Sequence, residues 1–267
     1  MRFSVIFKGI DGVPDFDVCE FSRKISKYCL CIPVLNENGR IHAELERAKR
    51  EQIDKFIDIV ICDGGTTDGS LDDQKLSGLN INSVLRIKSE GKLSGQLRMG
   101  FWWALQRGYE GVVTVDGNNK DSIESVLLFV QKLEEGFDFI QGSRFIKGGK
   151  ERNTPVMRYL AIRLIHAPLI SLAAGYNFTD TTNGFRGHSR NYLEHPQVKP
   201  FRDIFIDYDL LPYLSIKASQ LGLKVCEVPV ERIYPDNGEV PTKITNISSY
   251  WKLLVNLRKI IKGYYDC

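Results

Sequence analysis

Short apolar segments alternate with longer amphipathic segments from residue 28 to residue 142, and this alternation constrains the fold more than any other feature. The apolar segments are rich in β-branched residues, as buried strands are. Strands that alternate with helices of about ten residues or more need crossover connections and form a mostly parallel α/β sheet. The pattern predicts strands at residues 29–34, 57–62, 82–87, 112–115 and 137–141, and helices at residues 41–53, 95–107 and 122–134.

The second half of the chain is less regular. A long amphipathic helix is predicted at residues 157–173, and a polar segment follows at residues 179–186. A helix at residues 207–221 and a strand at residues 224–230 come next, then a loop containing proline and glycine. The last predicted helix, residues 247–262, has one apolar stripe, formed by Ile247, Trp251, Leu254, Leu257 and Ile261.

These patterns divide the chain into three parts. Residues 28–245 are predicted to form one α/β domain with a C-terminal lobe. Residues 1–27 can be assigned only as an extension with room for a short hairpin, and residues 246–267 as a terminal amphipathic helix.

Composition describes a globular protein with a full core. The chain has 267 residues, 43% of them apolar, and a formal charge of +3 from 36 basic and 33 acidic residues. This balance gives no argument for nucleic acid as a partner. The cysteines show neither zinc-site nor disulfide-framework spacing, which indicates a reducing cytoplasm. They are Cys19, Cys29, Cys31, Cys62, Cys226 and Cys267.

No membrane crossing is expected from the sequence. The apolar run at the N-terminus is too short for a signal peptide. The nearest approach to the roughly 20 apolar residues of a spanning helix is residues 167–174, which is much shorter.

The strand at residues 112–115 ends abruptly in Asp116 and a polar turn. In open α/β sheets, ligands bind outside the carboxyl ends of the strands, so this carboxylate is placed to hold a metal–phosphate group. The alternative is an Asx-type turn, in which Asp116 and Asn118 only bond backbone amides.

Two further strand ends carry similar signals. Residues 32–37 have the sequence Ile-Pro-Val-Leu-Asn-Glu, and residues 63–70 have the sequence Asp-Gly-Gly-Thr-Thr-Asp-Gly-Ser. Glycines let the backbone approach a ligand, and Asp63 can accept hydrogen bonds from a base or ribose. The second segment lacks the dinucleotide and P-loop patterns. Each segment alone could be an ordinary turn.

Together, in this order, the three strand ends resemble the family-two inverting glycosyltransferases of the GT-A fold, in the polyprenyl-phosphate group related to dolichol-phosphate mannosyltransferase. The resemblance covers approximately residues 28–243. It continues through Leu-Arg-Met-Gly-Phe at residues 97–101, Gly-Ser-Arg-Phe at residues 142–145, Thr-Asp-Thr-Thr-Asn-Gly-Phe-Arg at residues 179–186, and residues 222–230.

The resemblance implies roles for particular residues. Pro33, Glu37 and Asp63 would hold the base and ribose, with Asp68 supporting their loop. Asp116 would bind Mg²⁺ or Mn²⁺ at the donor diphosphate. The family has Asp-x-Asp at this strand end, and the preferred alignment puts Thr114 at its first position and Asp116 at its second, with Asn118 or Asp121 as candidate helpers.

Cations and one further carboxylate complete the predicted site. The cations would stabilise the leaving diphosphate or bind an acceptor phosphate. The alternative for each is a surface ion pair. Arg98 is also counted with the nucleotide site. Asp180 is the first choice for a general base, ahead of Asp207 and Asp209, and its alternative is a turn cap. A phosphate acceptor, with a second pKa of ~6, would need no base. The candidate cations are Arg98, Arg144, Arg186 and Lys243.

The sequence therefore predicts an inverting glycosyltransferase that moves a sugar from a nucleoside diphosphate sugar, with UDP favoured, to a polyprenyl phosphate or a lipid-linked or cell-surface glycan. It would act in the cytoplasm. The terminal helix has two interpretations: it covers the core, or it lies on the membrane surface and gives peripheral contact at the inner face. Two alternatives stay open: a sugar nucleotidyltransferase, and a catalytically degenerate nucleotide-sugar binding protein.

Overall fold

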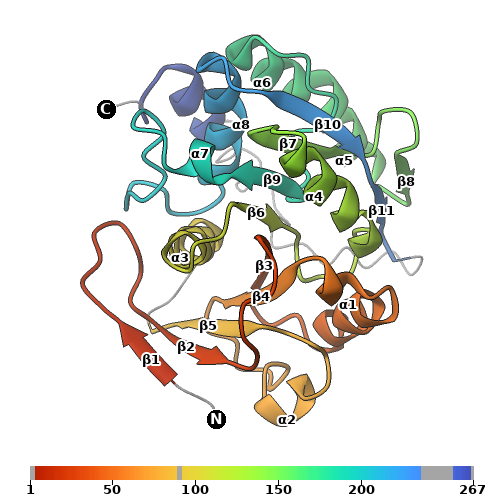
Figure 1. Cartoon of the computed structure of the whole chain (residues 1–267). Helices are drawn as coiled ribbons and strands as arrows, with labels where there is room; N and C mark the ends of the chain where they lie inside the picture. The colour runs from red at the N-terminus through yellow and green to blue at the C-terminus, as the bar shows by residue number, and fades with distance from the viewer. Residues whose placement is uncertain (1–3, 89–91, 236–254, 266–267) are drawn as a thin grey trace.

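The computed structural model describes residues 4–88, 92–235 and 255–265, and its main feature is one large sheet with helices on both faces (Figure 1). The strands lie in the order β1-β2-β5-β4-β3-β6-β9-β7-β10. They are β1 (Ser4–Phe7), β2 (Phe16–Glu20), β3 (Tyr28–Val34), β4 (Asp58–Asp63), β5 (Ser83–Ile87), β6 (Gly111–Thr114), β7 (Phe139–Ser143), β9 (Arg186–Ser189) and β10 (Val225–Pro229).

The centre of the sheet is parallel. β3 pairs with β4 on one side and with β6 on the other, and β4 pairs with β5. The chain therefore builds the sheet outward from β3 through β4 to β5, and then returns to the opposite side of β3 with β6. This reversal is a topological switch point, where α/β proteins bind ligands. The expected mostly parallel α/β fold is confirmed, and its predicted strands lie within a few residues of β3 to β7 and β10.

Side chains alternate between the two faces of the central strands, as the pleat requires. Cys29 and Cys31 of β3 join one apolar cluster, and Leu30 and Ile32 join the other. The first cluster contains residues of α3 (Leu93–Gln106), α6 (Ala167–Ala174), α7 (Arg190–Leu193) and α8 (Leu210–Gln220). The second contains residues of α1 (Gly39–Arg50), η1 (Ile53–Lys55), α2 (Asp73–Leu76), η2 (Ile123–Ser125) and α4 (Val126–Glu134).

The N-terminal extension forms the hairpin for which the sequence left room. β1 and β2 pair antiparallel, and β2 continues antiparallel onto β5. Phe16 and Val18 of β2 are buried in the first apolar cluster. The extension therefore widens the sheet at one edge, at the lower left of Figure 1.

One strand was not predicted. β9 lies antiparallel between β6 and β7, and its sequence, Arg-Gly-His-Ser, lacks the apolar pattern of a buried strand. A Cβ at position 187 would lie 2.8 Å from Cδ1 of Ile140, so a larger residue there would require this buried side chain to shift. A second, two-stranded sheet of β8 (Lys150–Arg152) and β11 (Glu231–Ile233) was also not predicted.

The helix predicted at residues 157–173 is longer than the sequence estimate. α5 (Val156–Ala161), the π-helical segment η3 (Ile162–His166) and α6 run without a break. The π-helical segment ends two residues before Pro168, whose missing N–H interrupts α-helical hydrogen bonding. By length and composition, Val156–Ala174 could cross a membrane, so the expectation that no segment approaches this length is wrong.

The C-terminal residues pack on the domain. Residues 255–261 are helical, and Leu257 and Ile260 are buried in the first apolar cluster. Ile261, predicted on the apolar stripe, is instead 43% exposed. Lys243 and the first part of the predicted terminal helix lie outside the described residues.

Candidate active site

The predicted nucleotide residues gather at one edge of the parallel sheet. Asp63 is the last residue of β4 and pairs in register with Val34, the last residue of β3. Glu37 follows β3 in the chain, and Asp116 follows β6 on the other side of β3. The fold therefore brings three separate sequence segments together at the switch point.

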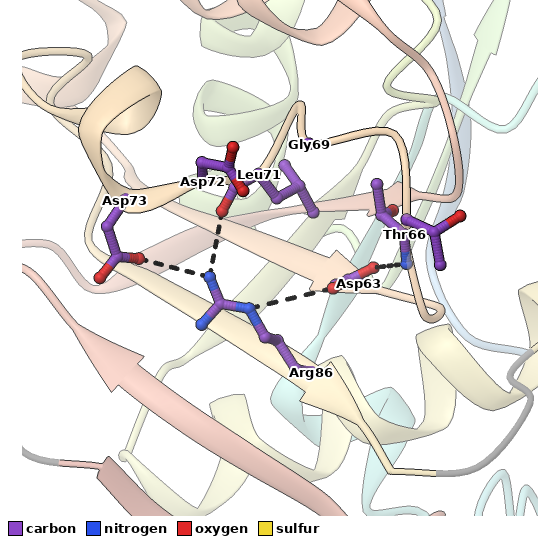
Figure 2. Close-up of a pocket in the computed structure, with 8 residues that line it drawn as sticks. Asp63, Thr66, Gly69, Leu71, Asp72, Asp73 and Arg86 are labelled. Carbon is purple, nitrogen blue, oxygen red and sulfur yellow. Dashed lines mark hydrogen bonds and ion pairs between the residues drawn. The ribbon is translucent and has the colours of Figure 1, made fainter.

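A pocket of about 470 Å³ opens beside Asp63, and Figure 2 shows the side chains that line it. Oδ1 of Asp63 accepts hydrogen bonds from the amides of Gly65 and Thr66, at 2.9 and 2.7 Å. Nε of Arg86 lies 4.0 Å from Oδ2 of Asp63, and its Nη2 donates to Leu71 O at 3.1 Å and Asp73 Oδ1 at 3.4 Å. One carboxylate oxygen thus shapes the loop while the other faces a guanidinium at the pocket.

Hydrogen bonds join the loops that follow β3 and β4. Oδ2 of Asp68 accepts from the amide of Asn38 at 2.7 Å, and Oδ1 accepts from the amide of Ser70 at 2.8 Å. Asn36 accepts from the amide of Thr67 at 2.8 Å. Burial alone would raise the pKa of Asp68, but these bonds lower it. Asp68 therefore holds the two loops together.

The other two predicted residues of this wall lie beside the strand end. Glu37 forms an ion pair with Arg40 at 2.9 Å. Pro33 lies within β3 and its carbonyl oxygen accepts from the amide of Gly117 at 3.4 Å. Both residues lie at the strand end, where the resemblance puts them.

Asp116 is paired with a cation that the sequence did not single out. Nη2 of Arg232 lies 3.1 Å from Oδ2 of Asp116, and Nη1 of Arg232 bonds Asp121. Burial alone would raise the pKa of Asp116, but the charges of Arg232 and Lys120 lower it. Burial and the charge of Arg232 lower the pKa of Lys120 to about 8. An anion and two cations therefore meet at the end of β6.

The structure changes which neighbours can assist Asp116. Thr114 is buried within β6, and its hydroxyl donates to Gly184 O at 2.7 Å, so this hydroxyl is engaged inside the fold. Asp121 is 1% exposed and paired with Arg232. Of the two candidate helpers, Asp121 is therefore taken up by Arg232. Oδ1 of Asn118 accepts from the amide of Lys120 at 3.3 Å and keeps a second lone pair for a cation.

The side-chain oxygens of Asp116 and Asn118 could hold a divalent cation such as Mg²⁺ weakly. The side chain of Asp116 is 28% exposed and negatively charged. Within residues 4–88, 92–235 and 255–265, no three His, Cys, Asp or Glu side chains form a metal cluster. Mg²⁺ needs only one or two protein carboxylates when water and substrate phosphates supply its other ligands. Asp116 with the amide oxygen of Asn118 satisfies this requirement.

The polar segment before β9 lies directly against Asp116. A Cβ at Gly184 would lie 2.6 Å from Oδ1 of Asp116, so a larger residue there would displace this carboxylate. Tyr208 also lies within electrostatic reach: burial raises the pKa of its hydroxyl, as do the negative charges of Asp116, Asp207 and Glu37. Gly184 and Tyr208 thus connect the strand end that carries Asp116 to the second half of the chain.

Arg144 and Asp180 form a buried ion pair. Nε of Arg144 donates to Oδ2 of Asp180 at 2.6 Å, and Nη2 donates to Oδ1 at 3.0 Å. Their side chains are 1% and 0% exposed. Burial would raise the pKa of Asp180, but Arg144 outweighs it and lowers that pKa. Because both oxygens face Arg144, Asp180 is poorly placed to accept a proton from an acceptor.

The other predicted cations have structural partners. Arg186 is 1% exposed, and its donors reach the carbonyls of Asn183, Leu211 and Thr181. Arg98 bonds the carbonyl of Gly12 and the carboxylate of Asp203, so it joins α3 to two distant segments and not to Asp63.

The two secondary base candidates are also engaged. Asp207 pairs with Lys92 at 2.8 Å, and Asp209 accepts from Ser94 at 3.0 Å. Sequence inspection missed Arg86, Tyr208 and Arg232. The one available signal was position: Arg86 lies in a predicted strand, and Arg232 comes just after one.

Comparison with solved structures defines the class. The chain superposes on glucosyl-3-phosphoglycerate synthase from Mycobacterium tuberculosis in complex with UDP, with a TM-score of 0.62 and 16% identity over 88% of this chain and 80% of that one. A complex of the same enzyme with Mn²⁺, UDP and glucosyl-3-phosphoglycerate gives a TM-score of 0.59 at 15% identity, over 88% and 77%. The fold is that of the GT-A glycosyltransferases, as expected from the sequence.

Curated relatives narrow this class. The chain is 25% identical to polyprenol monophosphomannose synthase of Mycolicibacterium smegmatis, over 78% of both chains. It is 25% identical to undecaprenyl-phosphate mannosyltransferase of Micrococcus luteus, over 78% of this chain and 84% of that one. It is 26% identical to dolichol-phosphate mannosyltransferase of Pyrococcus furiosus, over 87% and 64%. No family model matches. The resemblance to these transferases is confirmed, and the chain is a glycosyltransferase.

Proposed function

We propose that this protein transfers a mannosyl group from a nucleoside diphosphate mannose to a polyprenyl phosphate. The observation that carries the proposal is the meeting of Asp63, Glu37 and Asp116 at the switch point of the sheet. The sugar and acceptor are supported by three relatives named as polyprenyl-phosphate mannosyltransferases or synthases. These relatives favour transfer over nucleotidyl transfer.

The donor would lie along the strand ends. Its base and ribose would occupy the pocket beside Asp63 and Arg86, and its diphosphate would reach Asp116. A divalent cation, held by Asp116 and Asn118, would neutralise charge on the leaving diphosphate. Arg232 and Lys120 lie beside Asp116 and would add to this stabilisation. Lys243, one of the four candidate cations, lies outside the described residues, so its role stays a prediction.

A phosphate acceptor is consistent with the state of Asp180, Asp207 and Asp209, which are all engaged by other side chains and are poorly placed to act as a base. The acceptor oxygen would form a bond to C1 of the sugar while the bond from C1 to the diphosphate breaks, with the electron pair leaving on the nucleoside diphosphate. Attack from the opposite face inverts the configuration at C1. A phosphate monoester is mostly anionic at neutral pH, so it needs positioning and not deprotonation. Asp180, locked to Arg144, is consistent with a reaction that uses no general base.

The test is a transfer assay with radiolabelled GDP-mannose and UDP-sugars, each with a polyprenyl phosphate and with Mg²⁺, Mn²⁺ or EDTA. We expect lipid-linked mannose from one donor only, dependent on metal. The sequence favoured UDP, and the assay decides between the bases. The donor class is independently measured by thermal stabilisation with GDP and UDP, since a ligand at 100 times its Kd adds about 2.7 kcal/mol. Binding without any transfer would support the degenerate binding protein instead.

A further inference from the structure

The helix Val156–Ala174, formed by α5, η3 and α6, presents an apolar face to solvent. Only 17% of its most apolar window is buried, whereas a core helix would be mostly buried. Four of the exposed side chains are separated by four or eight residues, which places them on one stripe. They are Val156 at 72%, Leu160 at 41%, Leu164 at 70% and Leu172 at 82%, with Met157 at 78% beside them.

The opposite face of the same helix fixes its orientation. Ile162, Ala167, Ile170 and Ala174 are buried against the domain, and α6 packs on α8. The helix therefore lies flat on the catalytic domain, at the upper side of Figure 1. A helix held in this way can enter the surface of a bilayer with its outer stripe but cannot span the bilayer as an isolated segment.

The positive charge around the helix indicates what kind of surface would cover its apolar stripe. Between residues 145 and 175 the chain carries five basic residues and one acidic residue, Glu151. Arg163 is exposed and lies 5.0 Å from the ring of Phe145, next to the stripe. Two copies of this face would bring like charges together, whereas an anionic bilayer attracts them. The basic residues are Lys147, Lys150, Arg152, Arg158 and Arg163.

The helix is also tied to the polar segment of the site. His166 and Thr181 are joined by a hydrogen bond of 2.7 Å between Nδ1 and Oγ1. Ser171 bonds both the amide and the carbonyl of Phe178, at 3.0 and 3.2 Å. If the helix lies on a membrane surface, it therefore also fixes the distance from that surface to the segment that leads to Asp180 and Gly184.

We propose that Val156–Ala174 is an interfacial helix that seats the protein on an anionic lipid bilayer, with Leu164 and Leu172 among the acyl chains and the flanking lysines and arginines at the headgroups. This goes beyond the proposed transfer reaction and does not require it. It also moves the expected membrane contact from the C-terminal helix, whose described part packs on the core, to the helix before the polar segment.

The experiment is vesicle flotation of the purified full chain. Wild-type protein should float with vesicles of phosphatidylcholine containing about a third phosphatidylglycerol, and float poorly with pure phosphatidylcholine or at high salt. Leu164→Glu/Leu172→Glu should weaken partitioning by about tenfold or more, because each leucine loses its apolar burial. The control, Ile6→Glu/Ile25→Glu, makes the same charge change at side chains that are 55% and 71% exposed elsewhere, and should float like wild type.

Unchanged thermal melts will show that both double variants fold, and Leu164→Ser/Leu172→Ser repeats the test without added charge. Lys147→Gln/Lys150→Gln should weaken flotation on anionic vesicles alone. Wild-type flotation by the leucine variant, no flotation of wild type, or a dimer that this variant dissociates would each overturn the proposal. Because flotation needs neither donor nor acceptor, a failed transfer assay with intact flotation would contradict only the proposed function.

Discussion

Asp63 and Arg144 each stand at the end of a parallel strand of the same sheet, yet their side chains are used differently. Asp63 ends β4 beside a pocket of about 470 Å³, where one of its oxygens faces Arg86. Arg144 follows β7, and its side chain is 1% exposed and locked to Asp180. Asp63 thus keeps a polar atom at a pocket, whereas the carboxylate of Asp180 is used by Arg144 inside the fold.

This difference shows that residues in matched motifs need not face the pocket. Arg144, Asp180 and Arg186 all belong to motifs that carry the resemblance, but their contacts build the segment that lies against Asp116. We therefore expect these residues to act on the reaction by positioning this segment. Substitution of Arg144 should therefore lower the free energy of unfolding, whereas substitution of Asp116 should lower activity and leave the free energy of unfolding almost unchanged.

The largest expected effect is on stability. Arg144→Ala leaves the carboxylate of Asp180 buried without its partner, which costs about 3–5 kcal/mol of the free energy of unfolding. Urea denaturation measures this loss. The matched control is Arg50→Ala, which breaks an exposed pair with Glu51 and should cost under about 1 kcal/mol. Arg144→Met/Asp180→Leu should recover part of the loss. Equal, small losses in both single variants would remove the contrast between the halves.

The second effect is on activity with stability preserved. Asp116→Ala should lower mannosyl transfer by about 10²–10³-fold, the cost of one strong electrostatic contact to developing charge. Its unfolding free energy should change little, because Arg232 keeps Asp121 as a partner. Transfer at the wild-type rate, with the same metal dependence, would exclude Asp116 from the metal site. Asp121→Ala, by contrast, should destabilise the fold, since that carboxylate is fully buried.

Sequence alone was sufficient for the central strands and the donor edge. β3, β4 and β6 are apolar runs that end in carboxylates or polar turns, and parallel strands bring such ends together. Burial of polar residues was not predictable, because it depends on partners far away in the chain. Asp180 meets Arg144 across 36 residues, and Arg232 meets Asp116 across 116.

The missed strand has a related cause. β9 is enclosed by β6 and β7, but its four residues include arginine, glycine and histidine, so it has no apolar pattern to detect. Likewise, the exposed stripe on Val156–Ala174 has the same periodicity as a buried one, and periodicity does not say which apolar face meets the core.

The third prediction concerns nucleotide binding at the pocket beside Asp63. Arg86→Ala should weaken binding of the preferred nucleoside diphosphate by about 10- to 30-fold, or ~1.4–2 kcal/mol, because Asp63 and Asp73 lose the cation between them. Titration calorimetry with GDP and UDP measures this. Arg86→Lys keeps the charge but loses the planar fork, and should lie between. The side chain is 31% exposed, so stability should hold in both variants. An unchanged Kd would place the base away from this pocket.

The smallest effect tests the buried polar groups of the second half through pH. His188 on β9 is fully buried between the rings of Phe101 and Phe139, and neither of its nitrogens has a hydrogen-bond partner among the described residues. Burial, and then the charge of Arg186, lower the pKa of His188 to about 3. The unfolded chain, with a pKa near ~6.5, takes up a proton first as the pH falls. The stability contribution is therefore complete above about pH 6.5 and is lost progressively as the pH falls toward 3.

His188→Phe removes this proton uptake. Relative to its own value at pH 8, the unfolding free energy of the variant at pH 6 should fall by about 1 kcal/mol less than that of wild type. Urea denaturation at both pH values gives the comparison, and the pH 8 measurement absorbs any packing change. His166, whose pKa burial lowers to about 4, stays in both proteins and keeps part of the acid response. If the unfolding free energies of the variant and wild type depend on pH in the same way, folded His188 binds a proton as readily as the unfolded chain does. The protonated ring would then need a hydrogen-bond acceptor beside it.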